Sequence, residues 1–62
     1  MRAKVIIEGN SPYGDYAAGD TGFVDGYCRG GDGTPCAIVI LDKNDRFAMV
    51  YINQLKYNGN AL

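Results

Sequence analysis

The chain has 62 residues, of which 47% are apolar and 21% charged, so it is long enough for one small domain and too apolar for a disordered tail. Its formal net charge of -1 argues against a domain that binds nucleic acid or an anionic membrane through a basic face. Its apolar runs are far shorter than the ~20 residues of a membrane helix and than the core of a secretion signal, so we expect a cytoplasmic protein without membrane contact.

The first half of the chain alternates short β-branched and aromatic runs with turn residues, which is typical of an all-β domain. We expect a strand over residues 3–8, followed by a long loop over 9–19 that is rich in turn formers and tyrosine. A second strand is expected over 21–28. The glycine-rich segment 29–35 is predicted to be a flexible loop without packing contacts.

The second half predicts two more strands, over residues 36–41 and 46–51, joined by a tight turn over 42–45. Residues 52–55 are expected to form one helical turn, and 56–58 a short closing strand. Because an open sheet of this size leaves its edges exposed, we expect the five strands to close into a small barrel.

Two segments resemble small SH3-like barrel proteins. Residues 19–24 (Gly-Asp-Thr-Gly-Phe-Val) are similar to the KOW motif of ribosomal proteins and transcription elongation factors. Residues 51–55 (Tyr-Ile-Asn-Gln-Leu) resemble the helical turn that precedes the last strand of these barrels. The resemblance implies a five-stranded SH3-like barrel over residues 1–58, with a loose tail over 59–62. The barrel hosts many unrelated functions, so it does not specify one.

The chain departs from two branches of this family. It has no tryptophan, whereas SH3 domains that bind proline-rich peptides carry one in the peptide groove. It is weakly acidic, whereas KOW domains that bind RNA are generally basic.

Residue types that support catalysis are sparse. The chain has no histidine, the usual acid–base group near neutral pH and a common metal ligand. Most of its seven acidic residues fall in expected turns, where aspartate bonds to the local backbone. Segment 30–33 lacks the Lys-Ser/Thr of a phosphate loop, and 42–45 lacks the glycine and glutamate of a calcium loop. We therefore expect no enzyme, no cofactor and no metal.

The two cysteines, Cys28 and Cys36, leave two outcomes open. A cytosolic compartment keeps thiols reduced, which favours free and mostly buried side chains. A disulfide is the alternative if the two residues face each other across a hairpin.

Tyrosines form one candidate partner-binding set: Tyr13, Tyr16, Tyr51 and Tyr57. In SH3-like barrels the first long loop and the final helical turn lie on one side, so the resemblance implies that these side chains converge. Tyrosine offers a large contact area and a polar tip at low entropic cost, which suits an interface. The alternative is that one or two of them pack the loop over the barrel end.

A second candidate set lies on the outer face of the strands over 36–41 and 46–51. If alternate residues of both strands face the core, the outward residues form one apolar patch: Ile38, Ile40, Phe47, Met49 and Tyr51. Soluble monomers rarely leave such a patch bare, so we expect it to bind a partner protein or a second copy of the chain. The alternative is that the long first loop or the C-terminal tail covers it.

Together these features predict a non-catalytic protein-interaction module that docks on a larger protein and modulates its activity or assembly. The alternative is a KOW-like nucleic-acid-binding module of the transcription or translation machinery, whose aromatic residues would stack on bases. A small accessory subunit of an enzyme or electron-transfer complex is a third interpretation.

Overall fold

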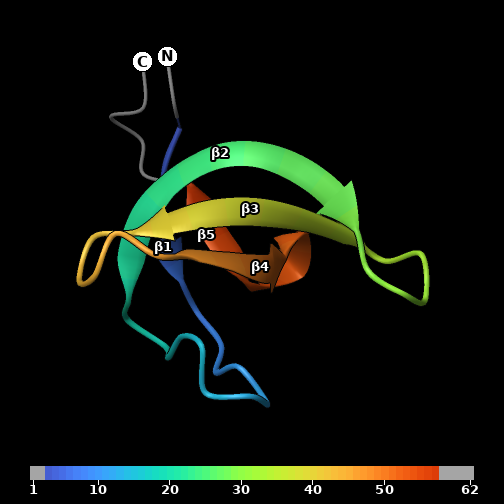
Figure 1. The fold of residues 1–62 in the computed structure, drawn as a ribbon, viewed down its shortest axis with the longest axis horizontal. Helices are drawn as coiled ribbons and strands as arrows, with labels where there is room; N and C mark the ends of the chain where they lie inside the picture. Colours follow the sequence, from blue (N-terminus) through green and yellow to red (C-terminus); the bar gives the residue numbers. More distant parts are fainter. Residues whose placement is uncertain (1–2, 58–62) are drawn as a thin grey trace.

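The computed structural model describes residues 3–57. Its elements in chain order are β1 (Lys4–Ile7), β2 (Thr21–Arg29), β3 (Pro35–Leu41), β4 (Phe47–Tyr51), the 3₁₀ turn η1 (Ile52–Gln54) and β5 (Leu55–Tyr57), as Figure 1 shows. The strands form one antiparallel sheet in the order β4-β3-β2-β1-β5. The all-β prediction is therefore confirmed. No helix in the described part of the chain is long and apolar enough to cross a membrane.

The expected barrel closure is not present among the described residues. β4 and β5 lie at opposite ends of the strand order, and no ladder joins them. After η1, which has only three residues, the chain continues into β5, and β5 pairs with β1 and not with β4. Leu55, expected in the helical turn, begins β5 instead. Residue 58 and the expected tail over 59–62 lie outside the described residues.

The core lies on the concave side of the sheet and follows the alternation of the strands. In β4, Ala48 and Val50 are buried, whereas the residues between and beside them are exposed. The buried set that forms one cluster is Val5, Ile7, Tyr16, Val24, Ala37, Val39, Leu41, Ala48 and Val50. The inward faces of β3 and β4 are therefore those that the alternation predicts.

Gly22 permits a close contact between β2 and β3. A Cβ atom at this position would collide with the backbone carbonyl of Ile40 and lie 2.8 Å from Cγ1 of Val39. Only glycine fits there without displacing backbone, so Gly22 has a structural role. Gly19 also has a structural role, because its φ of 95° lies in the left-handed region that favours glycine.

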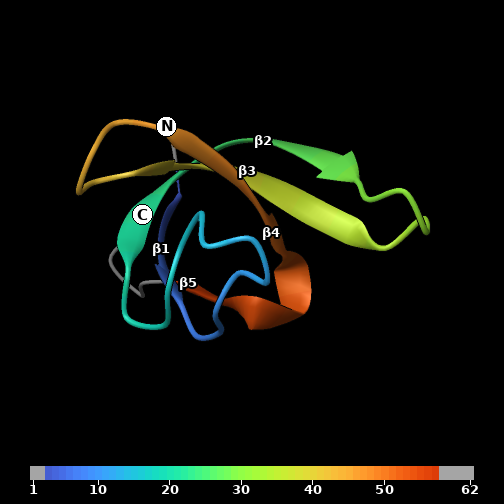
Figure 2. The same cartoon turned by 60° about the horizontal axis from the view of Figure 1, so that its bottom comes forward.

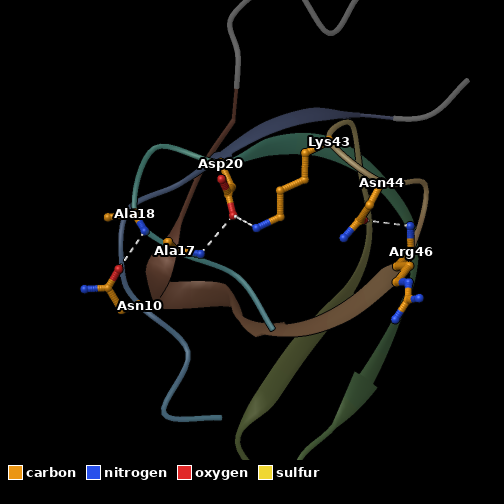
Figure 3. A network of polar contacts seen from close by, with 7 residues as sticks. All are labelled: Asn10, Ala17, Ala18, Asp20, Lys43, Asn44 and Arg46. Atoms are coloured by element: carbon orange, nitrogen blue, oxygen red, sulfur yellow. Dashed lines mark hydrogen bonds and ion pairs between the residues drawn. The ribbon is translucent and has the colours of Figure 1, made fainter. Parts of the chain in front are cut away.

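The first loop (residues 8–20) is fixed at its end by polar contacts around Asp20 (Figure 3). Oδ2 of Asp20 accepts a 2.9 Å hydrogen bond from the backbone N–H of Ala17 and forms a 2.8 Å ion pair with Nζ of Lys43. Oδ1 of Asn10 accepts a 2.8 Å bond from the N–H of Ala18. These bonds tie the loop to itself and to the β3–β4 turn.

Candidate functional site: a groove between the first loop and β4

A groove of about 500 Å³ lies between the first loop and β4. In both views the first loop lies on the side of β4 that faces away from β3 (Figures 1 and 2). The groove is lined by Ser11, Pro12, Tyr13, Asp15 and Tyr16 from the first loop, by Gly30, Gly31 and Cys36 from the β2–β3 hairpin, and by Phe47, Ala48, Met49 and Tyr51 from β4.

The first-loop wall is anchored by Tyr16. Its side chain is only 5% exposed, and its hydroxyl donates a 2.9 Å hydrogen bond to Oε1 of Gln54 in η1. Its carbonyl accepts a 3.0 Å bond from the N–H of Ser11. Burial, with a smaller contribution from Tyr51, raises the pKa of the Tyr16 hydroxyl above its usual range, so the group stays neutral and can donate. Tyr13 stands at the rim, 87% exposed.

The β4 wall consists of alternate side chains that the core does not use. Because Ala48 and Val50 point inward, Phe47, Met49 and Tyr51 point outward. They are 69%, 51% and 38% exposed, respectively. The exposure of this apolar wall therefore increases along β4 from Tyr51 to Phe47.

The end of the groove is formed by the β2–β3 loop, which is more ordered than the sequence predicts. The N–H of Gly30 donates to the Thr34 carbonyl at 2.8 Å, and the N–H of Gly33 donates to the Gly30 carbonyl at 2.9 Å. A Cβ atom at Gly30 would lie 3.6 Å from Cε1 of Tyr51. Gly30 and Gly31 also line the groove, a position that the sequence pattern does not predict.

The charge of the groove is negative. Among the described residues that line it, Asp15 is the one side chain charged at neutral pH. Lys43, in the β3–β4 turn outside the lining, pairs with Asp20. The lining offers no positive group to hold a phosphate.

The structure brings five of the predicted site residues together around the groove: Tyr13, Tyr16, Phe47, Met49 and Tyr51. Tyr16 also packs into the core, as the alternative for the tyrosines predicts. Ile38 and Ile40 lie outside the groove, half-buried on the outer face of β3. The ladder places Ile38 opposite Met49 and Ile40 opposite Phe47.

Tyr57 does not join the other tyrosines in the groove lining. Its hydroxyl oxygen lies 2.7 Å from that of Tyr27, within hydrogen-bonding distance. This bond, more than partial burial, raises the pKa of Tyr57 to about 12. The pair bridges β2 and β5, a structural role that the sequence pattern does not reveal.

The lining residues that sequence reasoning missed are Ser11, Pro12, Asp15, Gly30, Gly31, Cys36 and Ala48. Asp15 could have been found from its position, since it lies between Tyr13 and Tyr16, two predicted site residues. Within residues 3–57, no three His, Cys, Asp or Glu side chains lie close enough together to hold a metal ion.

No protein-family model, no curated protein and no solved structure matches this chain. Function is therefore inferred from the geometry of the groove. Over residues 3–57 the chain is a small all-β protein with an aromatic, weakly anionic groove between its first loop and the terminal strand β4.

Proposed function

We propose that the chain is a non-catalytic protein-interaction module that docks on a larger protein through the groove and modulates its activity or assembly. One observation carries the proposal: Tyr13, Phe47 and Tyr51 surround a single groove and leave much of their ring area exposed. Exposed aromatic side chains gathered around a concavity bury large areas on binding and are enriched in protein interfaces.

The groove is also preorganised. Tyr16 is held by its hydrogen bond to Gln54, and Phe47 and Tyr51 project from a regular strand. Side chains that are fixed before binding lose less conformational entropy when the partner arrives, which favours affinity.

A protein partner accounts better for the charges than a nucleic acid does. The groove carries Asp15, and none of the described residues that line it is basic. A nucleic-acid site needs cations free to contact phosphate, and its affinity falls steeply with salt. Binding to single-stranded RNA or DNA at low salt, lost at moderate salt, would support the KOW-like alternative instead.

We also propose that the sheet is a variant of the SH3-like barrel that the sequence resembles. Two features support this relationship. A 3₁₀ turn precedes the last strand, and the bond between Tyr16 and Gln54 holds the first long loop beside that turn. An experimental structure in which the fifth strand lies far from the first would contradict the assignment.

Affinity capture from nuclease-treated lysate of the source cells tests the docking function. The wild-type chain should recover a protein in stoichiometric amount, and Tyr51→Ala should lose it. Lys56→Ala is the control, since Lys56 is exposed and lies outside the groove lining. Recovery of nucleic acid alone from untreated lysate, or equal recovery by both variants, would contradict docking through the groove.

A further inference from the structure

The backbone of β4 exposes unused hydrogen-bonding groups on its outer side. The N–H of Leu41 donates to the carbonyl of Arg46 at 2.8 Å, so these two residues form a hydrogen-bonded pair of the β3–β4 ladder. Because such pairs alternate along an antiparallel ladder, the next one includes Ala48. The N–H and C=O groups of Phe47 and Met49 therefore point away from β3, toward the side where the first loop lies.

This side of β4 is open to a further strand. β3 is the only strand that pairs with β4 among the described residues, and no backbone hydrogen bond joins the first loop to β4 there. β4 (Phe47–Tyr51) contains no charged residue and no proline, the usual protections of an exposed sheet edge. The groove itself separates the edge from the first loop.

The charge of the groove favours a partner that carries a basic side chain. Asp15 faces the groove without a basic residue among the described lining residues, and Tyr13 and Phe47 present aromatic rings beside it. A lysine or arginine would donate a charge-assisted hydrogen bond to the carboxylate and would also contact the rings.

We propose that the groove binds an extended basic segment of the partner protein, which pairs with Phe47 and Met49 as an added strand and places a lysine or arginine beside Asp15. The main chain would supply affinity and the basic side chain specificity, as in other strand-addition complexes. The inference rests on the proposed docking function, because it specifies the partner of the same groove.

Phage-displayed random peptides selected on the immobilised full-length chain provide the probe. We expect enrichment of peptides in which lysine or arginine is flanked by β-branched or aromatic residues, the residue types that favour strands. In the complex with a selected synthetic peptide, amide hydrogen exchange at Phe47 and Met49, followed by NMR, should slow by at least about tenfold, because both groups become hydrogen-bonded.

Two variants separate main-chain pairing from side-chain contact. Met49→Pro removes an N–H that does not bond to β3, so it should weaken peptide binding by at least about fivefold while the β2–β3 amide signals persist. Met49→Leu, which keeps the N–H, should stay within about twofold. If Met49→Pro fails to fold, the exchange measurement on the wild type decides the question alone.

The charge is tested with Asp15→Asn, which should weaken binding by roughly threefold at low ionic strength and less at high salt. Asp45→Asn, in the exposed β3–β4 turn outside the groove lining, should leave binding unchanged.

The outcomes distinguish the strand-addition inference from the docking function. Unchanged exchange at Phe47 and Met49 in a peptide complex that Tyr51→Ala abolishes would overturn strand addition and leave docking standing. Selection of acidic or proline-rich peptides would overturn the basic, extended partner. Absence of both a selected peptide and a captured protein would overturn docking as well.

Discussion

The side-chain hydroxyl of Tyr16 donates a 2.9 Å hydrogen bond to Oε1 of Gln54, a residue 38 positions later in the chain. The bond joins the middle of the first loop to η1. Because the Tyr16 ring is also buried in the core, the loop is held both by packing and by a specific polar contact. One wall of the groove is thereby fixed to η1, which lies close to the end of the described chain.

Removing the Tyr16 hydroxyl should therefore destabilise the protein. Tyr16→Phe keeps the ring but leaves the Gln54 oxygen without its donor, and the free energy of unfolding should fall by about 1 kcal/mol. Urea unfolding followed by circular dichroism measures the change. Tyr13→Phe is the control, since that side chain is almost fully exposed and should cost nothing measurable. Equal effects of the two changes would show that the hydroxyl bond is unimportant.

Gly22→Ala should be among the most destabilising single substitutions in the sheet. The new methyl group would collide with the Ile40 carbonyl, and backbone cannot move aside as a side chain can. We expect a loss of at least about 2 kcal/mol, a large fraction of the stability of so small a domain. Gly31→Ala is the matched control, because no atom lies within 4 Å of the added carbon. An equal fall of the thermal unfolding midpoint in the two variants would contradict the close contact at Gly22.

The Asp20–Lys43 pair predicts a dependence of stability on pH. The hydrogen bond from Lys43, more than that from the Ala17 backbone, holds the pKa of the Asp20 carboxyl below its usual value of 3.8. The folded state therefore binds this proton less readily than the unfolded state does. The resulting stability is present above pH 3.8 and is lost as the pH falls through the lowered pKa.

Lys43→Met should raise the pKa of Asp20 and reduce the acid sensitivity of unfolding. Carboxyl chemical shifts followed by NMR from about pH 2 to pH 6 measure the pKa, and urea unfolding over the same range measures stability. Asp32 is an internal control, because the Thr34 backbone N–H is the main cause of its lowered pKa. An equal change in the pKa of Asp32, or an unchanged pKa of Asp20, would contradict the pairing of Asp20 with Lys43.

Cys28 and Cys36 are free thiols that face each other across the β2–β3 ladder. Thiol titration of the denatured, non-reduced protein should find both groups reactive. Their residues form a direct cross-strand pair, whose Cα separation of roughly 5.5 Å lies in the range that a disulfide accepts. Diamide should therefore oxidise them to an intramolecular disulfide and be reduced to the hydrazine. Mass spectrometry would detect the loss of two hydrogens, and Cys28→Ser should prevent it. A dimer linked by Cys36 in the wild type would contradict the register.

Much of the sheet could be predicted from sequence, because period-2 alternation and turn residues are local signals. The inward set of β3 and β4 follows directly from that alternation. The openness of the sheet could not be predicted, since it depends on where the three residues of η1 direct β5. The role of Asp15 in the groove and the bond between Tyr27 and Tyr57 also depend on distant parts of the chain meeting.

The outer face of the sheet gives the last prediction. Phe23, Ile40 and Phe47 are neighbours across β2, β3 and β4, and Met49 lies opposite Ile38 in the next row. Such continuous apolar surface favours association with a partner or with a second copy of the chain.

Met49→Glu places a charge in this surface at a position that is half exposed, so the fold should survive while association weakens by at least about tenfold, since a buried unpaired charge is costly. Ile40→Glu should weaken association similarly but also lower stability, because Ile40 is half-buried beneath its neighbours. Sedimentation equilibrium at high concentration and partner binding provide the measurements, with Asn53→Glu, an exposed position outside these rows, as the control. A wild-type chain that sediments as a monomer, with partner binding unchanged in both variants, would contradict a role of the outer face in association.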